Sequence, residues 1–374
     1  MIEVLAAKEL VAYIRSNTAV IDKMIVDADL RGMDLSGAIF KNVSFDRSDF
    51  RGVNLEDCNF INCTLRLTNF VGTDVEGVVF SECDLTDINM SSANLSGAVL
   101  HDCSLQHACL QSSVLEDAAF SRSVFNATDF RGSNLKDTNF CQSTIHQCDF
   151  RAANLDFTVF AECQLIAPDF SDTPMERVVI YKSEMPGANF SGSSFEMCTL
   201  MGIQLEGMDL RGLDFSRTQF AGSNLAGCDL SGCNLQQSNF EECDLRGAKL
   251  ERVNAPNALF CRVDASGASF AESELTQCLF VGARLEQANF NGCRAHQTNW
   301  AGASCVGAIF TRMDLTYADF SGADLSNTDL TDSILVRADL HGVRDQNARM
   351  PDRQSALPPD RERQQSDQWR LQQS

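Results

Sequence analysis

An apolar residue recurs at every fifth position from Ile25 to Leu340, without one slip in register. We call these positions the central slots, and most of them hold Leu or Phe. The residue two before a central slot is mostly small, and the residue one before it is very often Asp or Asn. Neither the 3.6-residue period of a helix nor the two-residue period of an ordinary strand fits this spacing. The sequence is therefore a repeat with a unit of five residues.

Each position of the unit has a physical role. Residues two apart in an extended segment point the same way, so the small residue and the central Leu or Phe face inward together. The Asp or Asn between them faces outward, where its short side chain can bond nearby backbone at a corner. All 23 glycines fall two residues after a central slot, which marks a corner that favours a positive φ. Five residues thus form one short side and one corner of a parallel β-helix.

The phenylalanines predict how many sides close one coil. Of the 24 Phe residues in central slots, 20 lie at positions divisible by ten, such as Phe130 and Phe140. This alternation keeps Phe on fixed sides only if the number of sides is even. Four is the smallest even number of sides that encloses a core. We therefore expect one coil to take twenty residues.

The repeats resemble those of the pentapeptide-repeat family, whose pattern is A(D/N)Lxx. ANLSG at 93–97, SNLAG at 223–227 and ADLSN at 323–327 match this pattern almost literally, and the resemblance covers residues 25–340. It implies a right-handed, four-sided β-helix. The predicted fold class is thus an all-β solenoid, a right-handed quadrilateral parallel β-helix with an N-terminal helical cap.

Five segments are predicted along the chain. Residues 1–24 form the cap, because apolar residues recur at helical spacing over residues 2–15 and a helix would cover the exposed first coil. Residues 25–170 form a first stack of coils. Residues 171–187, near Pro168 and Pro186, lose the consensus and form an irregular junction. Residues 188–344 form a second stack, and residues 345–374 a disordered polar tail.

The sixteen cysteines raise the alternatives of a metal site, a redox site or a disulfide framework. Twelve of them occupy the small inward position, and Cys305 fills a central slot. Buried cysteine packs as a small hydrophobe. A zinc site usually shows CxxC spacing or histidine partners, and four of the five histidines directly follow a central slot and face outward. We therefore expect core cysteines, no metal site and no cofactor. The twelve are Cys58, Cys63, Cys83, Cys103, Cys148, Cys163, Cys198, Cys228, Cys233, Cys243, Cys278 and Cys293.

The formal net charge of −21 argues against direct binding to nucleic acid or to an anionic membrane. Residues twenty apart should lie on one face, one coil above another. This spacing predicts two charged columns, one acidic and one of arginines. Most of the arginines follow an aspartate by two residues, and we expect each such aspartate to pair with its arginine. The first column is a candidate interaction surface of Glu56, Glu76, Glu116, Asp156, Glu176 and Glu196, with Lys136 as its only base. The second, on the neighbouring face, contains Arg31, Arg51, Arg131, Arg151 and Arg211.

Three functional hypotheses remain. The first is a non-catalytic protein-interaction scaffold or adaptor, such as an accessory protein or effector of a bacterial secretion system; the family resemblance implies this role. No Ser–His–Asp arrangement, P-loop or dinucleotide fingerprint is recognised in the sequence, which favours a protein that is not an enzyme. The second, also implied by the resemblance, is a DNA mimic that binds a type II topoisomerase (gyrase) and affects quinolone sensitivity. The third, a carbohydrate-active enzyme using Glu241 and Glu242, is disfavoured because adjacent side chains should diverge.

Partners are expected to be proteins, among them a second copy of the chain. No apolar segment approaches the roughly 18 residues of a membrane span. The charged N-terminus lacks the apolar run of a signal peptide. A chain without an export signal that keeps sixteen cysteines is expected to be cytoplasmic and reduced, which is compatible with export by a signal-independent system.

Overall fold

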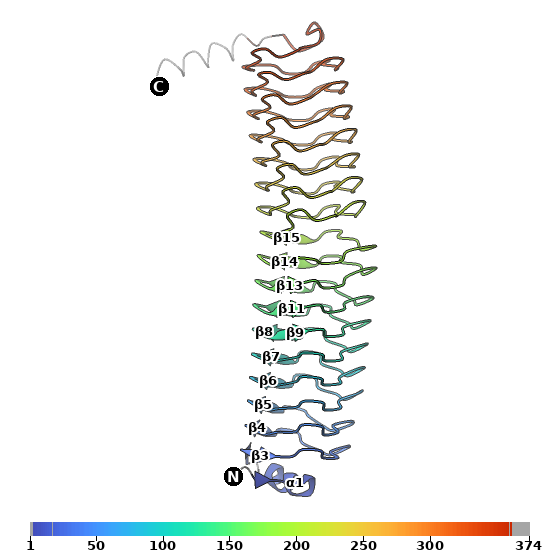
Figure 1. Cartoon of the computed structure of the whole chain (residues 1–374), viewed down its shortest axis with the longest axis vertical. Coiled ribbons are helices and arrows are strands. Elements are labelled where there is room, and N and C mark those ends of the chain that lie inside the picture. The colour runs from blue at the N-terminus through green and yellow to red at the C-terminus, as the bar shows by residue number, and fades with distance from the viewer. Residues whose placement is uncertain (1–2, 17, 359, 361–374) are drawn as a thin grey trace, which may run out of the picture. The chain divides into compact units, whose positions relative to one another are not determined.

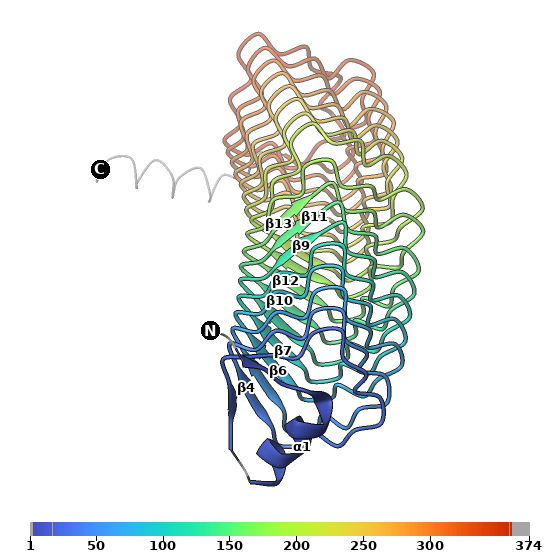
Figure 2. The same cartoon turned by 60° about the horizontal axis from the view of Figure 1, so that its bottom comes forward.

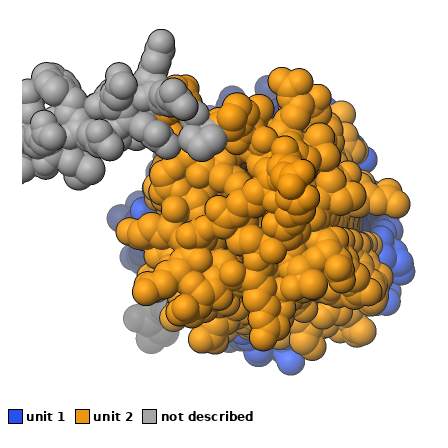
Figure 3. All heavy atoms as spheres, turned by 90° about the horizontal axis from the view of Figure 1, so that it is seen from above, with its two compact units in different colours: residues 1–194 blue, residues 195–374 orange. Residues whose placement is uncertain are grey.

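The structure is a computed structural model that describes residues 3–16, 18–358 and 360. The chain divides into two compact units, Met1–Ser194 and Phe195–Ser374, which Figure 3 colours separately. We call them unit 1 and unit 2.

Within each unit the backbone repeats every twenty residues. In unit 1, β4 (Ile39–Lys41) pairs in parallel with β5 (Asn59–Ile61), so that Phe40 lies opposite Phe60. Single parallel bridges continue this register in unit 2, from Gln204 with Asn224 to Asp329 with Arg349. Since each five-residue unit forms one side, four sides close each coil. The predicted four-sided parallel β-helix is confirmed, and Figure 1 shows the stacked coils.

The strands of unit 1 lie mainly on one side of the coils. Their order in the main sheet is β2, β4, β5, β6, β7, β8, β10, β12 and β14, and a second sheet contains β9, β11 and β13. The remaining bounds in unit 1 are β2 (Val20–Ile21), β6 (Val79–Ser81), β7 (Val99–His101), β8 (Ala119–Ser121), β9 (Val124–Asn126), β10 (Asn139–Cys141), β11 (Thr144–His146), β12 (Val159–Ala161), β13 (Gln164–Ile166) and β14 (Val179–Tyr181). Unit 2 contains β15 (Thr199–Met201).

The central slots fill the interior of each unit. Phe130 is fully buried and stacks on Phe150 of the next coil, with ring centroids 4.8 Å apart and an interplanar angle of 3°. Phe140, on the opposite side of the coil, meets Phe130 edge-on at 6.0 Å. The predicted alternation of phenylalanine between two sides is confirmed. It produces two columns of stacked rings that contact one another across the core.

The corners form as the sequence predicts. Asn54 Oδ1 accepts a hydrogen bond of 3.1 Å from the backbone N–H of Glu56, two residues on, as an Asx turn does. The residue that follows the turn, two after the central slot, adopts a positive φ, which glycine tolerates best. At Gly232, for example, φ is 71°. Asp57 and Phe157 occupy the same position with φ 57°. The corner therefore accepts other residues at some conformational cost.

The N-terminal cap is confirmed in part. Helix α1 (Ala7–Arg15) buries Leu10 completely and covers the first coil of unit 1, as Figure 2 shows. The prediction that the helix extends back over residues 3–6 is wrong, because β1 (Glu3–Val4) pairs in parallel with β3 (Lys23–Met24) and thereby extends the ladder. Residue 2 lies outside the described residues.

Two further segments bear on the predicted domains. Between residues 171 and 187 the twenty-residue register of unit 1 continues, with Asp169 bridged to Asn189 and Pro174 bridged to Ser194. The predicted boundary there stays a prediction.

At the other end, the first residues of the predicted tail contact the last coils of unit 2. The N–H of Leu357 donates to the carbonyl of Ala338 over 3.0 Å, and Arg349 bridges to Asp329. The assignment of residues 345–374 to a disordered tail stays a prediction. Residues 359 and 361–374 lie outside the described part.

Candidate functional site

Acidic side chains concentrate on one side of unit 1, the side whose central slots include Leu55, Leu115 and Leu155. We call its outward surface the acidic face. Five residues of the predicted acidic column lie on it, whereas Glu196 lies in unit 2. The sequence prediction considered only the position directly after the central slot. It missed the acids one position before and two positions after the central slot, which the same twenty-residue spacing would have found. The acidic face contains Asp34, Glu56, Asp57, Asp74, Glu76, Glu116, Asp117, Asp137, Asp156 and Glu176, with Lys136 and Arg177 as bases.

Two bases pair with three of the five acids in the later coils of the acidic face, namely Glu116, Asp137 and Asp156. Lys136 Nζ lies 2.8 Å from Glu116 Oε1. Arg177 donates two hydrogen bonds to Asp156, of 2.6 and 2.8 Å, and its guanidinium lies over the ring of Phe157. In unit 2, Glu196 pairs with a base over 3.3 Å. The acidic column is therefore less uniform than the sequence indicates.

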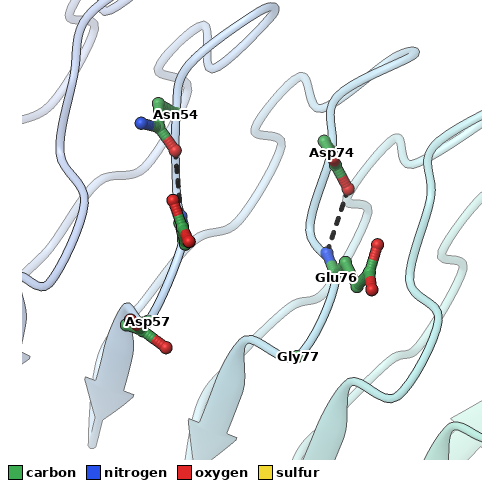
Figure 4. Close-up of a pocket in the computed structure, with 6 residues that line it drawn as sticks. Asn54, Asp57, Asp74, Glu76 and Gly77 are labelled. Carbon is green, nitrogen blue, oxygen red and sulfur yellow. Dashed lines mark hydrogen bonds between the residues drawn. The ribbon is translucent and has the colours of Figure 1, made fainter.

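The unneutralised part of the acidic face surrounds a shallow hollow of about 430 Å³. Glu56, Asp57, Asp74 and Glu76 line it, with Asn54 and Gly77. Among the described residues, no base forms an ion pair with any of these four carboxylates. Figure 4 shows Asp74 bonded to the backbone amide of Glu76.

One asparagine amide holds two of the four carboxylates of the hollow in place. Asn94 Nδ2 donates to Asp74 Oδ1 over 3.0 Å and to Glu76 Oε2 over 3.3 Å. Like charges stacked one coil apart repel one another, and this cost is not offset here by basic neighbours. The hollow therefore carries a concentrated negative potential that attracts cationic groups.

The arginine column is nearly neutral, as expected. Arg151 Nη2 lies 2.6 Å from Asp149 Oδ2, and its Nε lies 3.7 Å from Asp169 Oδ2 of the next coil. The hydrogen bond from Arg31 lowers the pKa of Asp29 to about 2. Because each guanidinium is already bonded to a carboxylate, this column is a poor site for phosphate. The equivalent pairs are Arg31 with Asp29, Arg51 with Asp49, Arg131 with Asp129 and, in unit 2, Arg211 with Asp209.

The cysteines are free thiols, and thirteen of the sixteen are buried. Cys228 Sγ donates to the carbonyl of Leu205 over 2.7 Å, and burial raises the pKa of Cys228 to about 11. The predicted role as core packing is confirmed for these side chains. No group of three or more potential metal ligands gathers among the described residues.

Thiol reactivity should follow this burial. In the native protein only Cys109, Cys141 and Cys261, which are partly exposed, are expected to react rapidly with a disulfide reagent such as DTNB. All sixteen should react after unfolding in denaturant. Rapid native reaction of more than three thiols per chain, counted by absorbance, would contradict the buried assignment. Cys141→Ser should lower the native count by one.

The pair suggested for a carbohydrate-active enzyme converges on one base. Arg262 Nη2 lies 2.5 Å from Glu241 Oε1, and its Nε lies 2.9 Å from Glu242 Oε1. Both carboxylates are thus occupied in an ion pair at the surface of unit 2. The expectation that the two side chains diverge is wrong, but their shared partner gives no reason to assign them to catalysis.

No helix in the described part of the chain has the length and apolar character needed to cross a membrane. No curated protein sequence matches the chain.

Several solved structures are similar to parts of it. Full-length QnrB1, a plasmid-mediated fluoroquinolone resistance protein, is 19% identical over 64% of this chain and 93% of its own, with a TM-score of 0.29. HetL, a pentapeptide repeat protein involved in heterocyst differentiation regulation from the cyanobacterium Nostoc, is 17% identical over 90% of this chain and 98% of its own, with a TM-score of 0.17. A pentapeptide repeat protein from the Arabidopsis thaliana thylakoid lumen is 30% identical over 30% of this chain and 68% of its own, with a TM-score of 0.14.

Two family descriptions match the sequence along most of its repeats. "Pentapeptide repeat region" matches residues 33–110, 53–130 and 193–270. "Pentapeptide repeats (8 copies)" matches residues 118–156, 268–299, 278–316, 299–332 and 308–344. With the five-residue period, the four-sided coil and these matches in agreement, the chain belongs to the pentapeptide-repeat family.

Proposed function

We propose that the protein is a scaffold that binds other proteins, and that the acidic face of unit 1 receives a basic segment of a partner. The observation that supports this most strongly is the hollow lined by Glu56, Asp57, Asp74 and Glu76, whose carboxylates have no basic partner among the described residues. Elsewhere on unit 1, Glu116 and Asp156 are paired with bases. The hollow therefore brings four carboxylates without a basic partner together at one place on the surface of unit 1.

The chemistry of such a partner follows from the hollow. Lysine and arginine side chains would replace the repulsion between stacked carboxylates by attraction, and their approach would be steered by the negative potential. Because exposed charges are screened by salt, binding should weaken as ionic strength rises. A role as an accessory protein or effector of a bacterial secretion system is one setting for this scaffold, and the family resemblance is its only support.

Partner capture tests the proposal. Proteins retained from a lysate of the native host by the intact chain should be lost, by at least about tenfold, on the double variant Glu56→Lys/Glu76→Lys. A tenfold loss needs only about 1.4 kcal/mol, and each charge reversal turns the attraction to a basic segment into repulsion. The control Glu242→Lys/Glu272→Lys makes the same change of charge in unit 2 and should retain them. Equal loss from both variants, or no loss from the first, would remove the acidic face as the binding surface.

The acidic face also supports the second candidate, a mimic of DNA that binds a type II topoisomerase. A mimic needs extended negative charge, which the first coils of unit 1 provide. The Arg–Asp pairs on the neighbouring face and the bases Lys136 and Arg177 interrupt it. A gyrase supercoiling assay separates the candidates: an effect of the purified protein below micromolar concentration, abolished by Glu56→Lys/Glu76→Lys, would favour mimicry over the scaffold.

A further inference from the structure

Phe157 is the one phenylalanine, of 25 in the chain, that does not occupy a central slot. It follows Leu155 by two residues at a corner of the acidic face, and its side chain is 45% exposed. Its φ of 57° is a conformation that a bulky side chain adopts only at a cost. In earlier coils Gly77 and Gly97 occupy the same position. The corner therefore forms without an aromatic residue, and the fold alone does not account for Phe157.

A guanidinium holds the ring of Phe157 from one side. Arg177, one coil further on, lies with its guanidinium carbon 4.5 Å from the centre of the ring. The same guanidinium donates to both carboxylate oxygens of Asp156, over 2.6 and 2.8 Å. An exposed ring that is already held in place loses little conformational freedom when another side chain packs on it. Phe157 is therefore suited to an apolar contact with another molecule.

The corner at Phe157 adjoins an apolar part of the main sheet. In β12 and β14, which pair in parallel, Val159 lies opposite Val179 and Ala161 lies opposite Tyr181. These four side chains point outward, and all of them are at least partly exposed. Tyr181, for example, is 38% exposed. We call these four residues together with Phe157 the apolar corner.

A single exposed apolar residue elsewhere in unit 1 shows the difference. Leu67 also has a φ of 57° and is 58% exposed. The outward residues of the strand positions beside it are Asn69 and its bridge partner Asn89. Apolar residues that stand alone in polar surroundings are normal on protein surfaces. The apolar corner is distinct because five apolar side chains adjoin one another there.

The apolar corner and the hollow both belong to unit 1, at a set number of coils from each other. Asp57 and Gly77, which line the hollow, occupy the same corner position as Phe157. Their separations from Phe157, 100 and 80 residues, correspond to five and four coils of twenty. At about 4.8 Å per coil, the ring lies roughly 19–24 Å from the hollow. An extended segment at about 3.3 Å per residue spans this distance with about six or seven residues.

We propose that the basic segment received by the hollow also carries an aromatic residue, about six or seven positions away, which packs on the apolar corner. This inference rests on the proposed function, since it specifies the partner of the same face. Between the two sites Lys136 is paired with Glu116, so the intervening part of the segment needs no positive charge. Attraction to the hollow steers any basic segment, whereas a second contact at a set spacing selects among such segments.

Two synthetic peptides test this inference on the full-length protein. The first contains three lysines, a spacer of six Gly and Ser residues and a tryptophan, and the second has serine in place of the tryptophan. Fluorescence anisotropy of a labelled terminus measures their dissociation constants. The first peptide should bind at least about fivefold more tightly, as is usual for an aromatic anchor. Sodium chloride should weaken the binding of both peptides without lowering the ratio of their affinities, because it screens charges and not apolar contacts.

Variants of the protein locate the aromatic contact. Phe157→Gly should abolish the difference between the peptides and leave the affinity for the second peptide unchanged. Its thermal unfolding midpoint should be unchanged or raised, because glycine suits a positive φ. Tyr181→Ser should reduce the difference between the peptides. The matched control is Leu67→Gly, which removes an exposed apolar side chain with the same φ from a different side of the coils and should leave both affinities unchanged.

The outcomes separate this inference from the proposed function. If Glu56→Lys/Glu76→Lys weakens the binding of both peptides and Phe157→Gly alone removes their difference, both are supported. If the first effect occurs but the two peptides bind equally to the intact protein, the acidic face still binds basic segments and the inference is overturned. A lower unfolding midpoint of Phe157→Gly, or an equal effect of Leu67→Gly on the peptides, also overturns it. If neither peptide binds the intact protein, the proposed function fails and this inference fails with it.

Discussion

Phe130→Asp is expected to unfold the coils around it and to lower the free energy of unfolding of unit 1 by more than the about 3–5 kcal/mol that removal of a buried Phe side chain costs. Phe130 is fully buried, stacked on Phe150 at 4.8 Å and in edge contact with Phe140. The variant loses these contacts and also places a carboxylate where no base can reach it. Urea denaturation followed by circular dichroism measures the loss.

A matched control places the same charge outside. Gln111 occupies an exposed slot of unit 1, and Gln111→Asp should change the free energy of unfolding by no more than about 0.5 kcal/mol. If Phe130→Asp and Gln111→Asp shifted the denaturation midpoint equally, the inward placement of the central slots would be wrong. Since coils contact only their neighbours, unfolding should begin near Phe130 rather than throughout the chain.

Trp300→Ala should lower the free energy of unfolding of unit 2 by about 3–5 kcal/mol, the largest effect expected for one substitution in this unit. Trp300 is fully buried and stacks on Phe280, with centroids 4.3 Å apart and an interplanar angle of 3°. Its Nε1 donates to Thr298 Oγ1 over 2.7 Å. The variant leaves a cavity and a hydroxyl that has lost this donor.

Trp300→Phe provides the comparison, because Phe fills the same slot in the coils on either side, at Phe280 and Phe320. Trp300→Phe keeps the stacked ring and loses only the second ring of the indole and its hydrogen bond to Thr298. It should therefore lower the free energy of unfolding by less than half as much as Trp300→Ala. Thermal unfolding in the two variants gives the ranking. A free energy of unfolding for Trp300→Ala within about 1 kcal/mol of the wild-type value would contradict the stacked core.

The repeat made most of the fold predictable. The five-residue period fixed the inward residues, and the alternation of Phe gave twenty residues per coil. The ends were less predictable because they have no repeat to constrain them. Glu3 and Val4 join the ladder through Lys23 and Met24, and a two-residue strand leaves no periodic signal. Arg349 extends the ladder of unit 2 although the consensus has ended.

The surface was predicted less completely than the core. The acidic column was recognised in one slot, but the hollow also needs Asp57 and Asp74 from the neighbouring slots. Which base pairs with which acid depends on side-chain conformation, and the repeat period of the sequence does not determine it. Arg177, for example, pairs with Asp156, which lies twenty-one residues earlier rather than one coil of twenty.

The twenty-residue register within each unit limits how such a chain can change in length. Deletion of one residue inside a unit would shift every later side chain by one slot, so that outward polar groups would turn into the core and Leu and Phe would face water. Removal or duplication of twenty residues would leave each side chain in its own column and change only the number of coils. We therefore expect viable length variants of this protein to differ by whole turns, which makes the coil, rather than the residue, the unit in which the protein can grow.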